Sequence, residues 1–417
     1  MEHYPELEKY YEGRLHRKQI EMDAVLKLAS IIQLNKSGEG MSLLFTPALT
    51  ASLGIQHFCA LEKEKGAWKV AALDAPDLIP EGFLSNPELS RIENTLDLKA
   101  SKLGKDTAFA AFEWAIPVFF NHVVHQLLLV SWQPGQDEKW TEESISFLQT
   151  IAGMLVVSIE NQQLLEYKIR QESVRKEIEI AGQVQNLLFP KKLPDNAELQ
   201  LYASYLPQMG VSGDYYDYIQ IDEYRFVVCV ADVSGKGVPA ALLMSNFQAT
   251  LRTLVKQGLH LNQIIAKLND ILCENSNLER FITAFLAIFD RKTNTIHYIN
   301  AGHNPPVLID EDGNMQILTK GTTILGVLNP LPFVNEDIIK LKGVNLLAAY
   351  TDGLTETDNL EGEEFGSDRA EAFFVKHYQD KLVDLHHHLT QTITKFCGPI
   401  GFKDDITLLT CRIKMEG

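Results

Sequence analysis

The sequence predicts an α+β protein in which two mixed domains are joined by a long helix. Its 417 residues are enough for two or three domains of ordinary size. Between residues 161 and 190, charged and apolar residues follow a helical period, and prolines end the pattern. Before this segment, helices enclose a few strands, whereas after it the chain turns to short strands, glycine turns and two long helical stretches.

The composition narrows the class of protein. A hydrophobic fraction of 45% is typical of a globular chain, and the net charge of −17 argues against a nucleic-acid partner, because phosphate binding relies on Lys and Arg. The five cysteines form no C-x-x-C pair, which disfavours a disulfide framework or zinc site and indicates a reducing compartment. Without a signal peptide or an apolar stretch of membrane-spanning length, we expect no transmembrane segment and a cytoplasmic location.

The N-terminal part reads as a small α+β unit. Residues 5–34 carry apolar groups at helical spacing, and residues 41–54 ("MSLLFTPALTASLG") form a second amphipathic pattern. Residues 55–73 predict two strands around a Lys-Gly turn. Residues 109–132 predict two more strands around an Asn-His turn.

A further helix closes this unit, with Thr141 as its candidate N-cap. The order helix, helix, hairpin, two strands, helix resembles that of the GAF domain, a ligand- or signal-sensing module. The resemblance is one of pattern, and the signature of the cyclic-nucleotide-binding members is absent. It implies a GAF-like sensor over residues 21–160, with an N-terminal helix at residues 1–20 and a signal that the sequence does not identify.

Residues 161–190 are expected to form a linker helix that ends at Pro190. Alternating steps of three and four residues select a seam in which six of eight positions are apolar: Leu164, Tyr167, Gln171, Val174, Ile178, Ala181, Gln185 and Leu188. The two glutamines and Gly182 weaken this seam. Two interpretations are therefore open, namely a coiled coil that makes the protein a homodimer, or an amphipathic helix that lies on its own domain.

Beyond residue 190, the pattern predicts helices at residues 238–257 and 261–275 and a C-terminal strand in "DITLLTCRI". Four motifs in this part each place aspartate beside an apolar run. They are "VSGDYYDY" with Asp214, "VADVSGKG" with Asp232, "AYTDGLTE" with Asp352, and "GFKDDITLL" with Asp404 and Asp405.

A single aspartate of this kind is usually a turn-former or a helix cap. Four such motifs together suggest more, because carboxylates brought close repel one another and a divalent cation relieves that repulsion. Oxygen ligands favour Mg²⁺ or Mn²⁺ over zinc, and two ions that share a carboxylate can activate water against a phosphoryl group. The residues alone therefore indicate two-metal phosphate chemistry.

The motifs, in this order, closely resemble the bacterial branch of the metal-dependent type 2C protein phosphatases, in particular the SpoIIE/RsbU-type serine phosphatases of sigma-factor partner switching. The resemblance covers about residues 175–415 and includes "EIEIAGQVQNLLFPKKLP" and "NAGHNPPVL". It implies an αββα sandwich over residues 191–417. It also implies two Mn²⁺ or Mg²⁺ ions and hydrolysis without a covalent enzyme intermediate.

By this resemblance, Asp232 bridges both ions and the carbonyl of Val233 is a further ligand. Asp352 and Asp404 hold one ion, and Asp214 supports the other, directly or through water. The resemblance places Asp405 behind these ligands, and the choice of Asp404 over Asp405 rests on alignment to the family alone. Gly235 and Gly237 are expected to allow the tight turn after Asp232, and Pro239 suits the first turn of the next helix.

Other features are less persuasive as sites. His303 is more often a turn residue than a ligand in such a setting, and adjacent side chains of His386–His388 point away from one another on a helix. The acidic run at residues 355–369 is interpreted as a solvated flap, with recruitment of a basic substrate as the alternative. An arginine that grips phosphate, as in the eukaryotic enzymes, is not identifiable.

The resemblance implies a phosphoserine/phosphothreonine protein phosphatase whose sensor regulates it and whose substrate is a phosphorylated STAS-domain anti-sigma-factor antagonist. One alternative is a catalytically inactive dimeric sensor or scaffold that binds the same kind of partner. Another retains the catalysis but replaces the substrate with a different phosphoprotein. Because every motif aspartate is present, the enzyme is the favoured hypothesis.

Overall fold

A computed structural model describes residues 5–34, 55–64, 66–73, 78–101, 103, 109–132, 142–208, 210–276 and 280–415. The chain divides into two compact units, Met1–Glu172 and Ser173–Gly417. The division falls within the predicted linker, inside the continuous helix α3 (Glu142–Asn186). In the part of the chain that the structure describes, no helix is long and apolar enough to cross a membrane.

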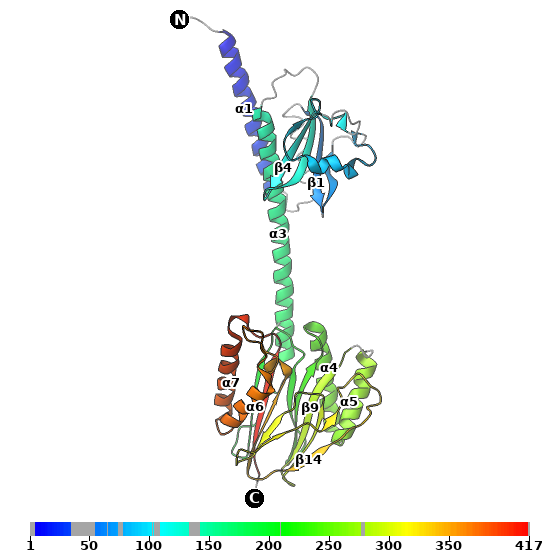
Figure 1. The fold of residues 1–417 in the computed structure, drawn as a ribbon, viewed down its shortest axis with the longest axis vertical. Helices are drawn as coiled ribbons and strands as arrows, with labels where there is room; N and C mark the ends of the chain where they lie inside the picture. The colour runs from blue at the N-terminus through cyan, green and yellow to red at the C-terminus, as the bar shows by residue number, and fades with distance from the viewer. Residues whose placement is uncertain are drawn as a thin grey trace. The chain divides into compact units, whose positions relative to one another are not determined.

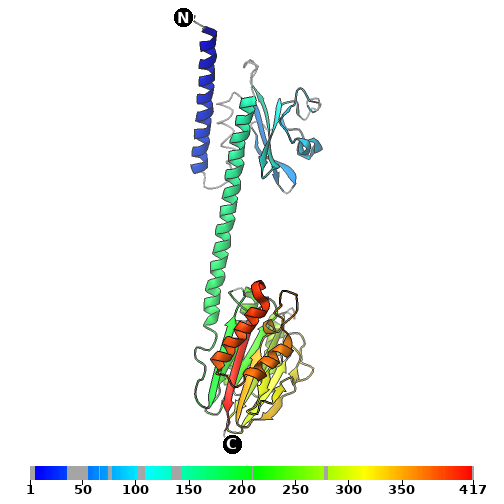
Figure 2. The same cartoon turned by 60° about the vertical axis from the view of Figure 1, so that its left-hand side comes forward.

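The N-terminal unit contains α1 (Pro5–Leu34) and a five-stranded antiparallel sheet in the order β2-β1-β5-β4-β3 (Figures 1 and 2). Its strands are β1 (Ile55–Glu64), β2 (Ala67–Leu73), β3 (Leu96–Asp97), β4 (Trp114–Phe120) and β5 (Val123–Trp132). Both predicted hairpins are confirmed. Asn121 and His122 join β4 to β5 with φ angles of 49° and 65°, as a tight hairpin turn requires.

Both faces of this sheet are covered. Ala24 of α1 and Leu148 of α3 pack with Phe58 and Leu128 on one face. The segment that contains the short 3₁₀ helices η2 (Phe83–Ser85) and η3 (Pro87–Arg91) covers the other. The predicted helix at residues 41–54 and the predicted N-cap lie outside the described residues.

The C-terminal unit has two mainly antiparallel sheets. The first has the order β13-β10-β9-β8-β7, with β14 also paired to β10, and the second has the order β12-β11-β15-β16-β6. The first comprises β7 (Tyr215–Gln220), β8 (Arg225–Val233), β9 (Ile282–Asp290), β10 (Thr295–Ala301), β13 (Gly321–Thr322) and β14 (Asp337–Lys340). The second comprises β6 (Leu199–Leu206), β11 (Val307–Ile309), β12 (Met315–Ile317), β15 (Val344–Tyr350) and β16 (Ile406–Lys414).

Alternation along the strands builds the layers. In β8, Val228 and Val230 face a core shared with Leu347 and Leu409 of the other sheet, whereas Cys229 faces a second core beneath helices. Helices α4 (Val238–Lys256) and α5 (Leu261–Ser276) cover the first sheet, and α6 (Gly366–His377) and α7 (Leu382–Cys397) cover the second (Figure 1). The result is an αββα sandwich, as predicted.

The acidic run at residues 355–369 is more ordered than a solvated flap. Asp358 pairs with Glu364 in an isolated β-bridge, and the side chain of Asn359 accepts hydrogen bonds from the backbone of Glu361 and Glu363 at 3.0 and 2.8 Å. Phe365 is buried, and α6 begins directly after it. The expectation therefore holds only for the exposed glutamates, because the asparagine and the buried ring fix the rest.

Candidate active site

The four aspartate motifs lie at paired strand ends. Asp214 immediately precedes β7 and Asp232 is the penultimate residue of β8, and these strands are neighbours with Tyr215 opposite Ala231. In the other sheet, Asp352 follows β15 and Asp404 and Asp405 precede β16, its neighbour. Antiparallel pairing therefore brings the carboxylates of each sheet to one end.

Hydrogen bonds connect the two groups across the sandwich. The hydroxyl of Thr351 donates to Asp214 Oδ2 at 2.8 Å and accepts from the backbone nitrogen of Thr407 at 2.9 Å. Asp405 is held by the backbone nitrogen of Gln208, 2.6 Å from its Oδ1. The structure thus joins aspartates that are far apart in the sequence.

The carboxylates perturb one another. Burial raises the pKa of Asp214 well above its ordinary value, and the charge of Asp232 raises it further. The pKa of Asp232 is raised to about 7, first by burial and then by Asp352. Burial and the charge of Asp404 also raise the pKa of Asp352. These shifts have the cause expected of a group of buried like charges.

An oxygen-only donor set under mutual repulsion fits hard divalent cations. Among the described residues, however, no three of these carboxylates each place an oxygen within 4.8 Å of the others. The spacing therefore assigns no carboxylate to a particular ion, and the individual roles remain predictions. The turn after Asp232 is as expected, because Gly235 and Gly237 have φ angles of 92° and 72° and Pro239 lies in the first turn of α4.

Lys236 is a site residue to which the sequence analysis assigned no role. Its Nζ lies 2.9 Å from Asp404 Oδ2 and donates to the carbonyl of Lys403 at 2.7 Å. Together with Asp404, the two lysines line a pocket of about 380 Å³, whose other lining residues are Gly353, Glu356 and Glu364. Burial and the nearby Asp352 raise the pKa of Glu356. The carboxylates thus border a cavity that also carries positive charge.

The last turns of α3 pack against the segment that leads to Asp214. Gln185 is buried, and its amide exchanges two hydrogen bonds with the backbone of Ser212, at 2.7 and 3.1 Å. A Cβ at Gly182 would lie 2.0 Å from the carbonyl oxygen of Gly210. Two of the three residues that weaken the coiled-coil seam, Gly182 and Gln185, therefore serve another purpose, which is to pack the end of α3 closely against residues 210–212.

The histidines differ from one another in their surroundings. His303 is buried and its Nδ1 lies 2.9 Å from the hydroxyl of Thr283, which is opposite Asp232 in the β8–β9 ladder. Burial lowers the pKa of His303 to about 4, so it is a neutral internal residue rather than a simple turn residue. In the triplet, His386 is buried while its two neighbours are exposed, so its ring points away from theirs as predicted. The rings of His387 and His388, by contrast, lie with their centroids 6.4 Å apart.

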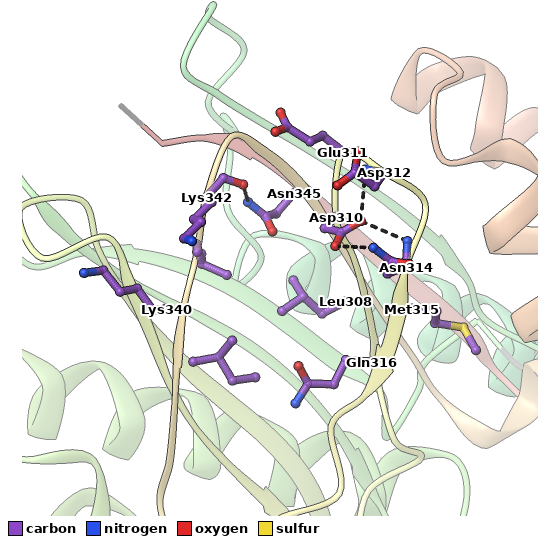
Figure 3. A pocket seen from close by; sticks show the side chains of 12 residues that line it. Leu308, Asp310, Glu311, Asp312, Asn314, Met315, Gln316, Lys340, Lys342 and Asn345 are labelled. Carbon is purple, nitrogen blue, oxygen red and sulfur yellow. Dashed lines mark hydrogen bonds between the residues drawn. The ribbon is translucent and has the colours of Figure 1, made fainter. Parts of the chain in front are cut away.

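A second pocket, of about 320 Å³, lies beside the β11–β12 hairpin and is separate from these residues (Figure 3). Its most prominent carboxylate, Asp310, accepts hydrogen bonds from the backbone nitrogens of Asp312 and Asn314 and from the side chain of Asn314 (Figure 3). These bonds lower the pKa of Asp310 and close the hairpin turn. The pocket therefore holds turn-forming groups rather than convergent catalytic ones.

Comparisons with known proteins agree with this geometry. Residues 222–414 match the family model for Stage II sporulation protein E (SpoIIE), a segment that includes every motif aspartate except Asp214. The chain is 27% identical over 329 residues to the phosphoserine phosphatase RsbU of Bacillus subtilis, covering 78% of this chain and 95% of that relative. It is 26% identical over 188 residues to the phosphoserine phosphatase RsbP of the same organism, covering 44% of this chain and 46% of RsbP.

Among solved structures, the SiaA-PP2C domain of Pseudomonas aeruginosa superposes with a TM-score of 0.53 at 20% identity. The match covers 59% of this chain and 99% of that domain. At this level of identity, the likeness establishes the fold of the C-terminal unit.

Proposed function

Residues 222–414 form a SpoIIE-type domain with a PP2C fold, and on this premise we propose that the protein is a metal-dependent phosphoserine/phosphothreonine protein phosphatase. The observation that carries the proposal is the convergence of Asp214, Asp232, Asp352, Asp404 and Asp405 from two sheets, with three of their pKa values raised. Buried carboxylates that repel one another are costly unless a cation is bound. If the protein uses the bound cation in catalysis, this explains why the chain keeps the buried carboxylates despite the stability they cost.

In this proposal, Asp232 would hold both ions, the carbonyl of Val233 would be a further ligand, and Asp352 and Asp404 would hold one of the ions. Two bound Mn²⁺ or Mg²⁺ ions would lower the pKa of a water molecule and neutralise charge on the phosphoryl group. Asp214 would hold the remaining ion directly or through water, in an orientation set by the hydroxyl of Thr351.

Asp405 would act as a supporting residue. Its hydrogen bond from the backbone of Gln208 fixes one of its oxygens, and its backbone nitrogen donates to Asp404 Oδ1 at 2.8 Å. This contact orients Asp404, which lies at the pocket wall. The arrangement favours Asp404 as the direct ligand of the two.

The sequence analysis identified no arginine that could bind the phosphate. Lys236 is the cation that we propose for this role. If Asp404 held a metal ion, its ion pair with Lys236 would be weakened, and the Lys236 ammonium group at the pocket wall could pair with a phosphoryl oxygen. The pocket also contains Glu356 and Glu364, which disfavour an acidic peptide beside the phosphoserine.

Phosphate release from a phosphoserine STAS protein, with Mn²⁺ titrated in, tests the activity. We expect Mn²⁺-dependent turnover by the full chain that is lost in Asp232→Asn, while the matched exposed variant Asp222→Asn retains it. A chain that neither releases phosphate nor binds Mn²⁺ would instead be the inactive scaffold that the sequence analysis considered.

The substrate is proposed to be a phosphorylated STAS-domain anti-sigma-factor antagonist. Support comes from the two relatives named phosphoserine phosphatases, RsbU and RsbP. The competing proposal is another phosphoprotein, and parallel assays with a STAS phosphoprotein and an unrelated phosphoserine peptide separate the two. A preference for the STAS protein of at least tenfold in kcat/KM supports the assignment.

We propose that the N-terminal unit is a GAF-like sensor. Helices cover one face of its five-stranded sheet, and the segment that contains η2 and η3 covers the other. This arrangement suits a small ligand or a protein signal. Comparing phosphatase activity of the full chain with that of residues 160–417 tests whether this unit restrains or enables the catalytic unit.

We also propose that α3 pairs with a second copy of the chain. The first half of the predicted seam is exposed: the side chains of Leu164, Tyr167 and Val174 are each at least half accessible to solvent. Near the C-terminal end of α3, by contrast, Gln185 is buried. The seam therefore divides between the two interpretations. Leu164→Asp with Val174→Asp should produce a monomer of reduced activity, measured by light scattering and phosphate release, and unchanged activity would remove pairing from the mechanism.

A further inference from the structure

His377, Asp380 and His388 form a cluster at the junction of α6 and α7, on the outer layer of the sandwich. His377 Nδ1 lies 2.7 Å from Asp380 Oδ2, and His388 Nδ1 lies 3.3 Å from the same oxygen. One ligand atom from each residue lies within 4.8 Å of the other two, and this is the one such trio among the described residues. None of the three belongs to the proposed catalytic machinery.

The spacing approximates that of a metal site. In a tetrahedral zinc site with nitrogen and oxygen ligands about 2.0–2.1 Å from the ion, the ligand atoms lie about 3.4 Å apart. The distances to Asp380 Oδ2, 2.7 Å from His377 and 3.3 Å from His388, are both somewhat shorter than this value, so small side-chain rotations are sufficient. Both Nδ1 atoms face one carboxylate oxygen, to which they donate their protons in the absence of metal. Binding an ion requires the tautomer with the proton on Nε2, which leaves the Nδ1 lone pair free to coordinate.

Neighbouring elements hold the His377 ring and the backbone at Asp380 in place. The His377 ring stacks on Phe373, with centroids 4.4 Å apart, and the backbone nitrogen of Asp380 donates to the carbonyl of His377 at 3.0 Å. Arg412 of β16 donates to the carbonyl of Asp380 at 2.7 Å, which ties the α6–α7 turn to the sheet. A site whose ligands are already fixed loses little conformational entropy when an ion binds.

The charge and exposure of the cluster suit an ion that enters from solvent. The hydrogen bond from His377 is the main cause of the lowered pKa of Asp380, which is therefore ionised at neutral pH. The side chains of His377, Asp380 and His388 are 19%, 35% and 46% exposed, so a water molecule can complete the coordination. The guanidinium of Arg412 is engaged by the carbonyls of Tyr378 and Asp380.

We propose that His377, Asp380 and His388 bind a borderline dication of the Zn²⁺ class, with water as the fourth ligand. Two imidazole nitrogens and one carboxylate oxygen favour Zn²⁺ over the hard ions that suit the oxygen-only active site. The bound ion joins the end of α6 to α7 and so stabilises the helical layer on the second sheet. A hydrogen-bonded cap of the α6–α7 turn, without metal, is the competing interpretation.

Calorimetric titration of the full chain with ZnCl₂ tests this proposal, and His387→Gln is the matched control for His388→Gln. His387 is the adjacent residue on α7, is exposed, and bonds to Gln391 rather than to the cluster. The Asp232→Asn background separates this site from Zn²⁺ bound at the active-site carboxylates. We expect one equivalent of Zn²⁺ in the Asp232→Asn background, retained with His387→Gln and weakened at least about tenfold with His388→Gln.

Histidine-labelled NMR of the wild-type chain gives a second readout that does not depend on any variant folding. Zn²⁺ should shift the ring signals of His377 and His388 strongly and those of His387, whose ring centroid lies 6.4 Å from that of His388, far less. The signals of exposed His122 in the N-terminal unit should not change. Equal Zn²⁺ affinity in the His388→Gln and His387→Gln proteins, or ring signals that do not respond to Zn²⁺, would overturn the proposal.

Discussion

Replacing Asp232 by asparagine should stabilise the metal-free C-terminal unit at the pH values where the enzyme works. Asp232 is the point at which the charges of both sheets meet, because its pKa is raised by burial and by Asp352, Asp404 and Asp405. Asparagine preserves the size of the side chain and cannot ionise. The substitution therefore removes the repulsion without opening a cavity.

The pKa gives the size of the effect. A rise from 3.8 to about 7 corresponds to about 4 kcal/mol of free energy between the two protonation states. Because the folded state holds this proton more tightly than the unfolded state does, the contribution of Asp232 to the stability of the metal-free protein is most favourable below about pH 4 and is lost as the pH rises to about 7. Up to about 4 kcal/mol is a large part of the 5–15 kcal/mol typical of a domain, and the part shared with Asp214 reduces it.

The two units can be followed separately during unfolding. All four tryptophans lie in the Met1–Glu172 unit, at positions 68, 114, 132 and 140. Tryptophan fluorescence therefore reports the N-terminal unit, whereas tyrosine fluorescence and calorimetry also follow the C-terminal unit. Urea unfolding of the metal-free wild type and Asp232→Asn, from about pH 4 to about pH 8, gives the difference in the free energy of unfolding.

We expect the advantage of Asp232→Asn to grow with pH and to vanish near pH 4, with no change in the tryptophan signal. Saturating Mn²⁺ should reverse the order, because each ion at about 100 times its Kd adds about 2.7 kcal/mol to a protein that binds it, and two ions add about 5.4 kcal/mol. An advantage that is independent of pH, or a metal-free variant less stable than wild type at pH 8, would refute the electrostatic reasoning.

Three further predictions concern other contacts. Lys236→Met should raise KM for the phosphoprotein about tenfold at saturating Mn²⁺, because a charge-assisted hydrogen bond contributes about 1.5 kcal/mol or more, and partial rescue by Lys236→Arg distinguishes lost charge from lost fold. Arg252→Met should lower the free energy of unfolding, measured with urea, by about 3 kcal/mol. The guanidinium contacts the buried carboxylate of Asp217 at 2.8 and 2.9 Å, and the substitution leaves that carboxylate without its partner, so Arg252→Lys should recover only part of the loss. Gly182→Ala should reduce phosphatase activity and increase proteolysis of α3 near its end, because the new Cβ would lie 2.0 Å from the carbonyl oxygen of Gly210, whereas exposed Glu179→Ala should not.

Local pattern predicted much of the fold because strands and helices depend on near neighbours. The hairpin at residues 55–73, the left-handed Asn121 turn and helices α4 and α5 follow from alternation, turn chemistry and helical period. The acidic run before α6 was harder to interpret, because its order comes from the Asn359 side chain and a buried phenylalanine. Composition alone marks such a segment only as solvated.

The sequence by itself determined the kind of chemistry this protein is suited to, because aspartates beside apolar strands at Asp214, Asp232 and Asp352 limit the donor set to oxygen. Only the tertiary structure decided which groups act together. Thr351 meets Asp214 across 137 residues, and Gln185, a weak position in a coiled coil, becomes a buried anchor. Such contacts depend on how two sheets and a helix pack in space, and the local sequence around each contacting residue does not contain that information.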